Sequence, residues 1–206
     1  MSLDAAFARF PVLTTARLRL REPRAEDAEG IFALKSDPEV TAPYAAEPYR
    51  SIDQSRNWIR DRIADFARRD GLVWVVALAA DDRAIGSVCY WHFEPGGRCA
   101  EVGYEFARPH WGRGIGTEAV GEVVRFGFAE MQLHRIEACP LARNAPSIRL
   151  LEKLGFRREG VLRDRVLRPG GFEDQLYLAR LASDPIGAAP TDGSRAPGDR
   201  PGRDVR

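Results

Sequence analysis

Three glycines alternate in the middle of the chain, and they restrict its folding more than any other feature. They are Gly112, Gly114 and Gly116, in the segment His110–Ala119 (HWGRGIGTEA), between a strand pattern and a helix pattern. Alternate glycines free the backbone from Cβ constraints, so several amides can converge on one anion. The start of the helix adds its dipole and its free N–H groups. Since a turn without a ligand needs fewer glycines, the segment indicates a phosphate or pyrophosphate site.

Two well-known phosphate loops fit this turn poorly. A Walker loop ends in Gly-Lys-Ser/Thr, and this turn has no lysine. Residues 114–119 match the dinucleotide pattern G-x-G-x-x-A, with Glu137 lying 21 residues beyond Gly116. That pattern opens a parallel βαβ domain, whereas three apparently antiparallel strands precede the turn here. The sequence therefore disfavours an ATPase and a nicotinamide enzyme.

The hydrophobic pattern predicts one folded domain with a mixed sheet of the α+β or α/β class. The predicted order is β-α-α-β-β-β-α-β-α-β-β. Strands are expected at about 17–21, 72–79, 85–93, 99–106, 135–139, 158–167 and 172–179. Helices are expected at about 25–35, 114–130 and 145–154, and from the Ser51 capping box to Gly71.

The two ends of the chain are expected to lie outside this domain. Residues 1–13 are predicted as an N-terminal extension, 14–182 as the domain, and 183–206 as a disordered tail. The tail is rich in Pro, Gly and Arg and has few large aliphatic residues. Such a segment buries too little apolar surface to offset the entropy of ordering it.

Composition excludes several classes of protein. The chain has 31 basic and 30 acidic residues, a formal charge of +1, which argues against a dedicated nucleic-acid binder. No run of about 18 apolar residues suggests a membrane span, and the N-terminus lacks a secretory pattern. Cys89, Cys99 and Cys139 have no CxxC spacing and are read as buried residues in a reducing cytosol. Because Cys and His do not cluster, no metal site is predicted.

Two sequence blocks resemble one family. Pro109–Ala119 (PHWGRGIGTEA) resembles the acetyl-CoA pyrophosphate loop of the GNAT acetyltransferases, with Trp111 where many members have Arg or Gln. This variation resembles the Rim-type branch, the N-terminal acetyltransferases that modify ribosomal proteins. Asn144–Phe156 (NAPSIRLLEKLGF) is similar to that branch's N-x-x-S-x-x-x-x-E-K-x-G-F. The resemblance covers about residues 14–181 and implies a GNAT-like acyl-CoA N-acyltransferase fold.

The resemblance also implies how acetyl-CoA binds, in the gap where strands 99–107 and 135–139 separate. The pantetheine is expected to contact backbone groups near Phe106, Ala107 and Arg108, and the side chain of Asn144. The pyrophosphate is expected on the amides of Arg113, Gly114, Ile115, Gly116 and Thr117. Two alternatives stay open: Asn144 also suits the N-cap of the next helix, and the Arg113 side chain can equally face solvent.

The implied reaction is acetyl transfer to a primary amine, in this branch a protein N-terminal α-amine. The ammonium must lose a proton to a carboxylate or a water chain, and the oxyanion needs a backbone N–H, expected at Phe106 or Ala107. Glu101 and Glu105 are the candidate bases, since residues four apart in a strand share a face. Each suits an ordinary salt bridge with an arginine equally well.

The departing thiolate of CoA either takes a proton from an acid or leaves unaided. Many GNAT enzymes have a Tyr seven residues after the Asn, where this chain has Leu151. Ser147 is then the nearest hydroxyl, although it also suits capping its helix. Tyr44 and Tyr49, with Glu47, are expected to form an aromatic and acidic rim around the acceptor.

Two other functions stay open at this stage. One is a catalytically inactive acyl-CoA-binding or sensing module, which is favoured if neither Glu101 nor Glu105 faces the cleft. The other is an acetyltransferase for a small-molecule amine. The expected partners are acetyl-CoA and an amine acceptor, and homodimers are common among similar proteins.

Overall fold

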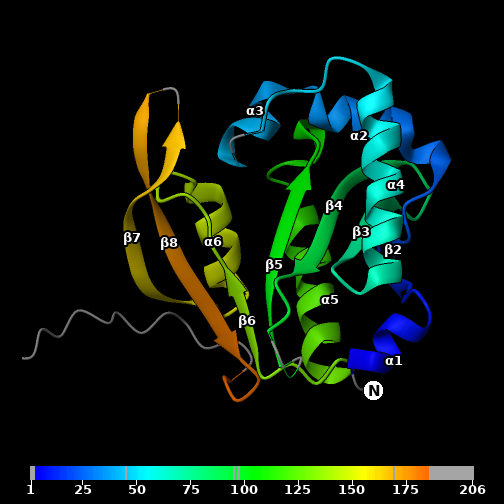
Figure 1. The fold of residues 1–206 in the computed structure, drawn as a ribbon. Coiled ribbons are helices and arrows are strands. Elements are labelled where there is room, and N and C mark those ends of the chain that lie inside the picture. The colour runs from blue at the N-terminus through cyan, green and yellow to red at the C-terminus, as the bar shows by residue number, and fades with distance from the viewer. Residues whose placement is uncertain (1–2, 45, 95, 97, 169, 186–206) are drawn as a thin grey trace, which may run out of the picture.

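The chain folds around one mixed sheet (Figure 1). The computed structural model describes residues 3–44, 46–94, 96, 98–168 and 170–185. In this part of the chain the sheet has eight strands in the order β1-β2-β3-β4-β5-β6-β8-β7. The strands are β1 (Leu13–Thr14), β2 (Leu18–Arg21), β3 (Leu72–Leu78), β4 (Ala84–Trp91), β5 (Cys99–Phe106), β6 (Arg135–Ala138), β7 (Arg157–Arg168) and β8 (Gly171–Leu181).

Helices cover both faces of this sheet. The α-helices are α1 (Leu3–Ala8), α2 (Ala28–Lys35), α3 (Pro38–Thr41), α4 (Ile52–Arg68), α5 (Ile115–Ala129) and α6 (Ala145–Lys153). Short 3-10 turns lie at η1 (Ala25–Asp27), η2 (Ala42–Tyr44) and η3 (Arg108–His110). The predicted mixed α+β sheet is confirmed.

The parallel pair β5 and β6 creates the opening in which the site lies. The other strand pairs of the sheet are antiparallel. β5 pairs with β6 only from Cys99 to Glu101, opposite Arg135 to Glu137. β5 then continues to Phe106, whereas β6 ends at Ala138. The two strands therefore separate beyond Glu101, as expected from the family resemblance.

The central strand β3 is buried on both faces, which explains its nearly continuous apolar sequence. Trp74 belongs to the main core, together with the apolar side of α5. Its neighbour Val75 belongs to a second cluster with Ile31 and Leu34 of α2. Because successive strand residues point to opposite faces, β3 joins both layers.

The ends of the chain differ from the simplest expectation. α1 lies in the segment expected as an extension, and the ring of Phe7 lies 5.5 Å from that of Phe66 in α4. The predicted tail lies almost entirely outside the described residues. Its first part includes Asp184, whose carboxylate accepts a hydrogen bond from the N–H of Leu181 at the end of β8.

Two local predictions need correction. α4 ends at Arg68 rather than at Gly71, because Arg69 takes the left-handed conformation (φ 63°) that ends the helix. The predicted set of helices also lacks the short helical turn α3, which ends at Thr41. Asp37 caps that turn by accepting a hydrogen bond from the N–H of Glu39 at 3.0 Å.

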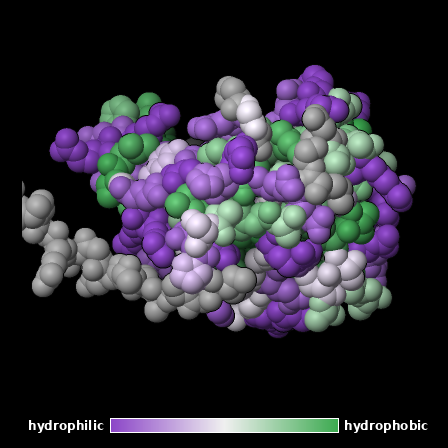
Figure 2. Space-filling model, turned by 90° about the horizontal axis from the view of Figure 1, so that it is seen from below, coloured by the Kyte–Doolittle hydropathy of each residue, from purple (hydrophilic) through white to green (hydrophobic). Residues whose placement is uncertain are grey.

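Hydrophilic side chains cover most of the face seen in Figure 2, with small apolar patches between them. Among the described helices, none combines the length and apolar character that a membrane span requires. The described His, Cys, Asp and Glu residues form no cluster suited to a metal ion. Cys89, Cys99 and Cys139 are unpaired, and the first two are buried.

Candidate active site

Two cavities meet beside the free half of β5. The loop cavity has a volume of about 690 Å³ and is lined by the glycine turn, including Gly112, Gly114 and Gly116. The hairpin cavity has a volume of about 450 Å³ and lies between α4 and the β7–β8 hairpin. Both are lined by Pro43, Tyr44, Tyr104, Glu105, Asn144 and Ser147. Molecules bound in the two cavities would meet at these shared residues.

The glycine turn has the conformation that its sequence predicts. Gly112 (φ 70°) and Gly114 (φ 75°) take left-handed conformations, which L side chains rarely adopt. Gly114 is the N-cap of α5, so the free amides of the first helical turn are available to an anion. A Cβ at Gly116 would lie 2.8 Å from Leu150 Cδ1, so a larger residue at this position would require the Leu150 side chain of α6 to shift.

The loop cavity contains some of the expected cofactor-binding residues. Phe106, Gly114, Gly116, Thr117 and Asn144 line it. The Arg113 side chain is exposed, and Ile115 is buried in the core. These two residues contribute backbone to the turn, and their side chains do not line the cavity.

The backbone after β5 is already engaged in hydrogen bonds. The N–H of Ala107 donates to Ile85 O at 2.9 Å, so it is not free to hold an oxyanion, contrary to expectation. Arg108 Nε donates to Asp37 Oδ2 at 2.5 Å. Trp111 Nε1 donates to Phe106 O at 2.6 Å, which folds this residue of the signature back onto the end of β5.

Basic side chains that were not predicted from the sequence also line the loop cavity. Arg149 and Lys153 lie one helical turn apart on α6, together with His110 from η3. Burial, with the nearby charges of Arg83 and Arg113, lowers the pKa of His110. The i, i+4 spacing of Arg149 and Lys153 places both side chains on one face of the predicted helix, and this spacing could have indicated a basic patch from the sequence.

Glu105 is the most heavily bonded carboxylate of the site. Its Oε1 lies 2.6 Å from Lys35 Nζ and accepts a hydrogen bond from Ser87 Oγ at 3.0 Å. Its Oε2 accepts a short hydrogen bond from the hydroxyl of Tyr44. The side chains of Lys35 and Glu105 are 10% and 9% exposed. The salt bridge of Glu105 is therefore with Lys35 and not with an arginine, which was the alternative considered from the sequence.

Three aromatic rings surround the ammonium of Lys35. Its Nζ lies 5.6, 5.8 and 5.1 Å from the ring centroids of Tyr44, Tyr49 and Trp58, within the range of cation–π attraction. Burial and the charge of Glu105 raise the pKa of both tyrosines. Tyr44 and Tyr49 thus flank the chain's own lysine, and Tyr44, which is exposed, also lines both cavities.

Glu47 does not join these tyrosines. Its carboxylate is highly exposed, and its Oε2 lies 3.9 Å from Arg50 Nη2. The acidic part of the expected rim is therefore absent from the neighbourhood of Tyr44 and Tyr49.

Glu101 lies in a different environment from Glu105. It lines the hairpin cavity, and its Oε2 lies 3.1 Å from Nδ1 of the exposed His92. Its Oε1 has no hydrogen-bond partner among the described residues. Both predicted carboxylates therefore face a cavity. The hypothesis of a catalytically inactive module is favoured only if neither of them does, so this arrangement counts against it.

A pair of hydroxyl groups lies where the cavities meet. Tyr104 OH lies 2.8 Å from Ser147 Oγ and 3.3 Å from Ser147 O. Burial raises the pKa of Tyr104 to about 12, so this phenol stays protonated at neutral pH. Asn144 Oδ1 accepts a hydrogen bond from the N–H of Ser147 at 3.3 Å, so Asn144 is the N-cap of α6 as well as a cavity residue.

A helix start with free amides, a buried carboxylate and a protonated hydroxyl pair lie around two connected cavities, an arrangement suited to a group-transfer enzyme with a phosphorylated co-substrate. The chain matches the Acetyltransferase (GNAT) domain over residues 17–157 and belongs to this family. Acetyl-CoA is accordingly its co-substrate, and the protein is an N-acetyltransferase. Phe106, the glycine turn and Asn144 line a cavity suited to that co-substrate.

Similar proteins agree with this assignment. The uncharacterized N-acetyltransferase YoaA of Bacillus subtilis is 38% identical over 161 residues, 78% of this chain and 91% of YoaA. The spermidine N(1)-acetyltransferase of Vibrio cholerae is 26% identical over 165 residues, 79% of this chain and 93% of that protein. Mycobacterium smegmatis RimJ, solved with CoA-disulfide, has a TM-score of 0.72 and 26% identity, and the match covers 80% of this chain and 82% of RimJ.

Proposed function

We propose that this protein transfers the acetyl group of acetyl-CoA directly to the α-amine of a peptide or protein N-terminus. The observation that carries the proposal is the junction of the two cavities at Glu105, Tyr104 and Ser147. A thioester entering from the loop cavity and an amine entering from the hairpin cavity meet there. No acyl-enzyme is needed when both reactants reach the same point.

The cysteines of the hairpin cavity support direct transfer. Cys89 and Cys139 both line this cavity. Burial raises the pKa of each thiol to about 12. Since the thiolate is the nucleophilic form, neither cysteine is prepared to carry the acetyl group at neutral pH.

The two carboxylates have different roles in this proposal. Glu105 already accepts hydrogen bonds or ion pairs from Lys35, Ser87 and Tyr44, so it serves to fix the geometry of the junction. Glu101 has one oxygen without a hydrogen-bond partner among the described residues, and it takes the proton of the ammonium, directly or through water. The released amine attacks the thioester carbonyl.

The hydroxyl pair completes the reaction. Ser147 Oγ is held by Tyr104 OH at 2.8 Å. As the C–S bond breaks, the pair donates a proton to the sulfur of CoA, and the nitrogen of the tetrahedral intermediate gives its surplus proton back to the pair. This gives Ser147 the role expected of it and adds Tyr104 as its partner.

The charge of the hairpin cavity favours a peptide over a polyamine. Its lining includes the cations Lys35, Arg62 and Arg168, but only the acids Glu101 and Glu105. A polyamine brings several positive charges into this surrounding, and like charges repel. An N-terminus brings a single ammonium. We therefore propose an acceptor of a different chemical class from spermidine, which the similar spermidine N(1)-acetyltransferase is named for.

The test is a CoA-release assay with three kinds of acceptor. The first is a set of peptides whose only amine is a free N-terminus, and the second is a set of N-acetylated peptides whose only amine is a lysine side chain. The third is spermidine. The proposal predicts turnover of the free N-termini and little turnover of the other two. Turnover of spermidine or lysine alone would overturn the choice of acceptor. Absence of acetyl-CoA binding by calorimetry would overturn the whole assignment.

A further inference from the structure

We propose that Arg168, assisted by Arg62, binds a carboxylate of the acceptor, so that the preferred substrates carry a carboxylate close to the reacting amine. This inference rests on the proposed acetylation of an amine in the hairpin cavity. It names a recognition site within that cavity and a chemical class of substrate.

The guanidinium of Arg168 is buried, and two of its nitrogens lack a hydrogen-bond partner in the described part of the chain. Its side chain is 8% exposed and lines the hairpin cavity near the end of β7. Its Nε and Nη2 are buried and have no hydrogen-bond partner among the described residues. Burying a charged donor without a partner is costly, which indicates that a partner arrives with the ligand.

The nearest carboxylate does not fill this role. Glu173 Oε1 lies 3.9 Å from Arg168 Nε, beyond hydrogen-bond distance. The other oxygen of Glu173 accepts a hydrogen bond from Arg143 Nε at 2.5 Å. Glu173 is thus held by Arg143, and it compensates the charge of Arg168 only from a distance.

Arg62 repeats this pattern on α4. Its Nη2 lies 2.9 Å from Asp65 Oδ2, but its Nε is buried and unpaired within the described part of the chain. Both arginines line the same cavity. In Figure 1, α4 and the β7–β8 hairpin lie on opposite sides of β5, so the two arginines approach the cavity from different elements.

Neither acid of the cavity lining is bonded to these nitrogens. Glu105 is paired with Lys35, and Glu101 contacts His92. The unsatisfied nitrogens therefore require an anion from the ligand. A guanidinium presents parallel N–H groups that match the two oxygens of a carboxylate. In a peptide, that carboxylate is an acidic side chain near the N-terminus. In a free amino acid it is the α-carboxylate of the reacting residue, and an acceptor of this kind would replace the peptide of the proposed function.

Matched acceptors separate these two sources. The first pair is a free amino acid and its amide. The second is a set of peptides with Asp or Glu at the second or third position, and the same peptides with Asn or Gln. In at least one of these pairs, we expect kcat/KM to be about 10- to 100-fold higher for the acid than for the matching amide. This factor is the effect expected from one hydrogen bond to a charged group.

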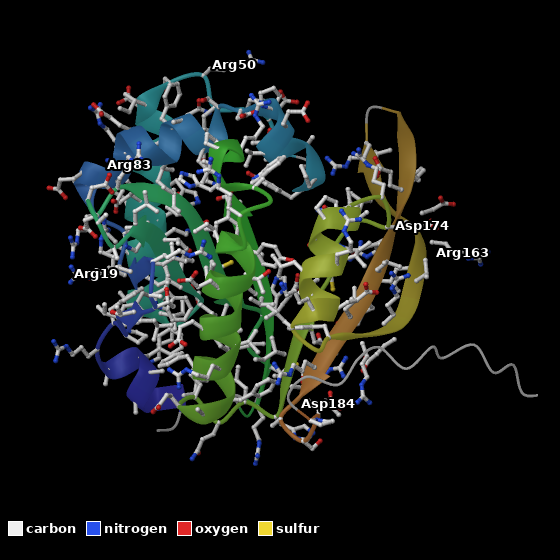
Figure 3. All side chains as sticks on the ribbon, turned by 180° about the vertical axis from the view of Figure 1, so that it is seen from behind. Arg19, Arg50, Arg83, Arg163, Asp174 and Asp184 are labelled. Atoms are coloured by element: carbon white, nitrogen blue, oxygen red, sulfur yellow. The ribbon has the colours of Figure 1, made fainter. Side chains whose placement is uncertain are left out.

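The variant Arg168→Gln is expected to abolish this preference by lowering kcat/KM for the acid, while the value for the amide stays within about twofold. Arg168→Lys keeps the charge without the planar fork and is expected to fall between the two. Arg163→Gln is the matched control, because Arg163 is an exposed arginine of the same strand, and Figure 3 shows it on the outer side of the hairpin. The Arg163→Gln variant removes the same charge and is expected to keep the wild-type preference for acids over amides.

The two proposals fail in different ways. If the wild type acetylates acids and amides equally, or if Arg163→Gln lowers the preference as much as Arg168→Gln, the carboxylate site is wrong and the amine acetylation stands. If no amine is acetylated, the proposed function itself is wrong. The KM for acetyl-CoA and the unfolding midpoint of each variant verify that the loop cavity and the fold are intact.

Discussion

Lys35 Nζ lies 2.6 Å from Glu105 Oε1, at the junction that both cavities share. The pair is buried, and three aromatic rings enclose its ammonium. A buried ion pair is weak evidence for stability, but it fixes the position of both partners. This lysine therefore holds the central carboxylate of the site in one orientation.

Removal of Lys35 tests this relationship. We expect Lys35→Met to lower the free energy of unfolding by about 3–5 kcal/mol, since it leaves Glu105 buried without a cation. The double variant Lys35→Met/Glu105→Gln should recover a large part of this loss, because no unpaired charge remains. Denaturant unfolding of both variants and of Glu105→Gln measures the coupling. Strictly additive losses would contradict the pairing.

A second prediction concerns the hydroxyl pair. The pKa of Tyr104 is raised to about 12, so its hydroxyl remains a donor throughout the neutral range and should add no ionisation to the kcat profile there. Tyr104→Phe is expected to lower kcat by about 10- to 100-fold with a small change in stability. Combining it with Ser147→Ala should lower kcat little further, because the two groups act as a unit.

The control for this prediction is Tyr177→Phe. The hydroxyl of Tyr177 donates to Glu137 Oε2 at 2.7 Å, and Tyr177 lines neither of the two cavities. The Tyr177→Phe variant should therefore leave kcat unchanged. Fully multiplicative losses for Tyr104→Phe and Ser147→Ala would indicate that the two hydroxyls act separately.

A third prediction concerns the glycine turn. Gly114 has φ 75°, so Gly114→Val costs about 1–2 kcal/mol in backbone strain and moves the first amides of α5. We expect the affinity for acetyl-CoA in calorimetry to fall by at least about tenfold, the equivalent of 1.4 kcal/mol. Gly160→Val is the matched control, because a Cβ at Gly160 meets nothing within 4 Å. Unchanged binding by the Gly114 variant would remove the turn from the cofactor site.

The sequence predicted the parts of the site that are local in the chain. The turn from Gly112 to Gly116 carries its conformation in its own glycine spacing. The strand Cys99–Phe106 matches its prediction at both ends, because apolar residues precede a proline that cannot continue a ladder. The Asn144 cap is likewise local, since it reaches only to Ser147.

Contacts between distant segments were not predictable in this way. Tyr44 and Glu105 are 61 residues apart, and Tyr104 and Ser147 are 43 apart. Strand alternation places Tyr104 and Glu105 on opposite faces of β5, yet both reach the junction at the free end of the strand. Arg168 is one of 29 arginines, and only the packed fold shows that two of its nitrogens are buried without a hydrogen-bond partner among the described residues.

The final prediction concerns Glu118, which ties the glycine turn to the N-terminal strands. It accepts hydrogen bonds from Thr15 Oγ1 and from Arg17 Nε, both at 2.6 Å, and from the N–H of Arg17 at 3.0 Å. Arg17 Nη1 in turn donates to Arg113 O at 3.0 Å. Partial burial alone raises the pKa of Glu118, but these hydrogen bonds outweigh it and hold the pKa below the usual 4.5.

The sign of the pH dependence follows from this lowered pKa. A carboxyl whose pKa is lower in the folded state adds stability above its unfolded pKa and loses it as the pH falls through the folded pKa. We expect Glu118→Gln to be less stable than the wild type by about 1–2 kcal/mol near pH 7. The two unfolding midpoints should converge as the pH drops below about 4.

The control lies one turn further along α5. Glu122 pairs with Arg125 on the same helix at 2.7 Å, and Glu122→Gln should stay within about 0.5 kcal/mol of the wild type at every pH. Thermal unfolding between about pH 3 and pH 7 compares the three proteins. A stability gap for Glu118→Gln that stayed constant into the acid range would show that its carboxylate charge does not hold the turn in place.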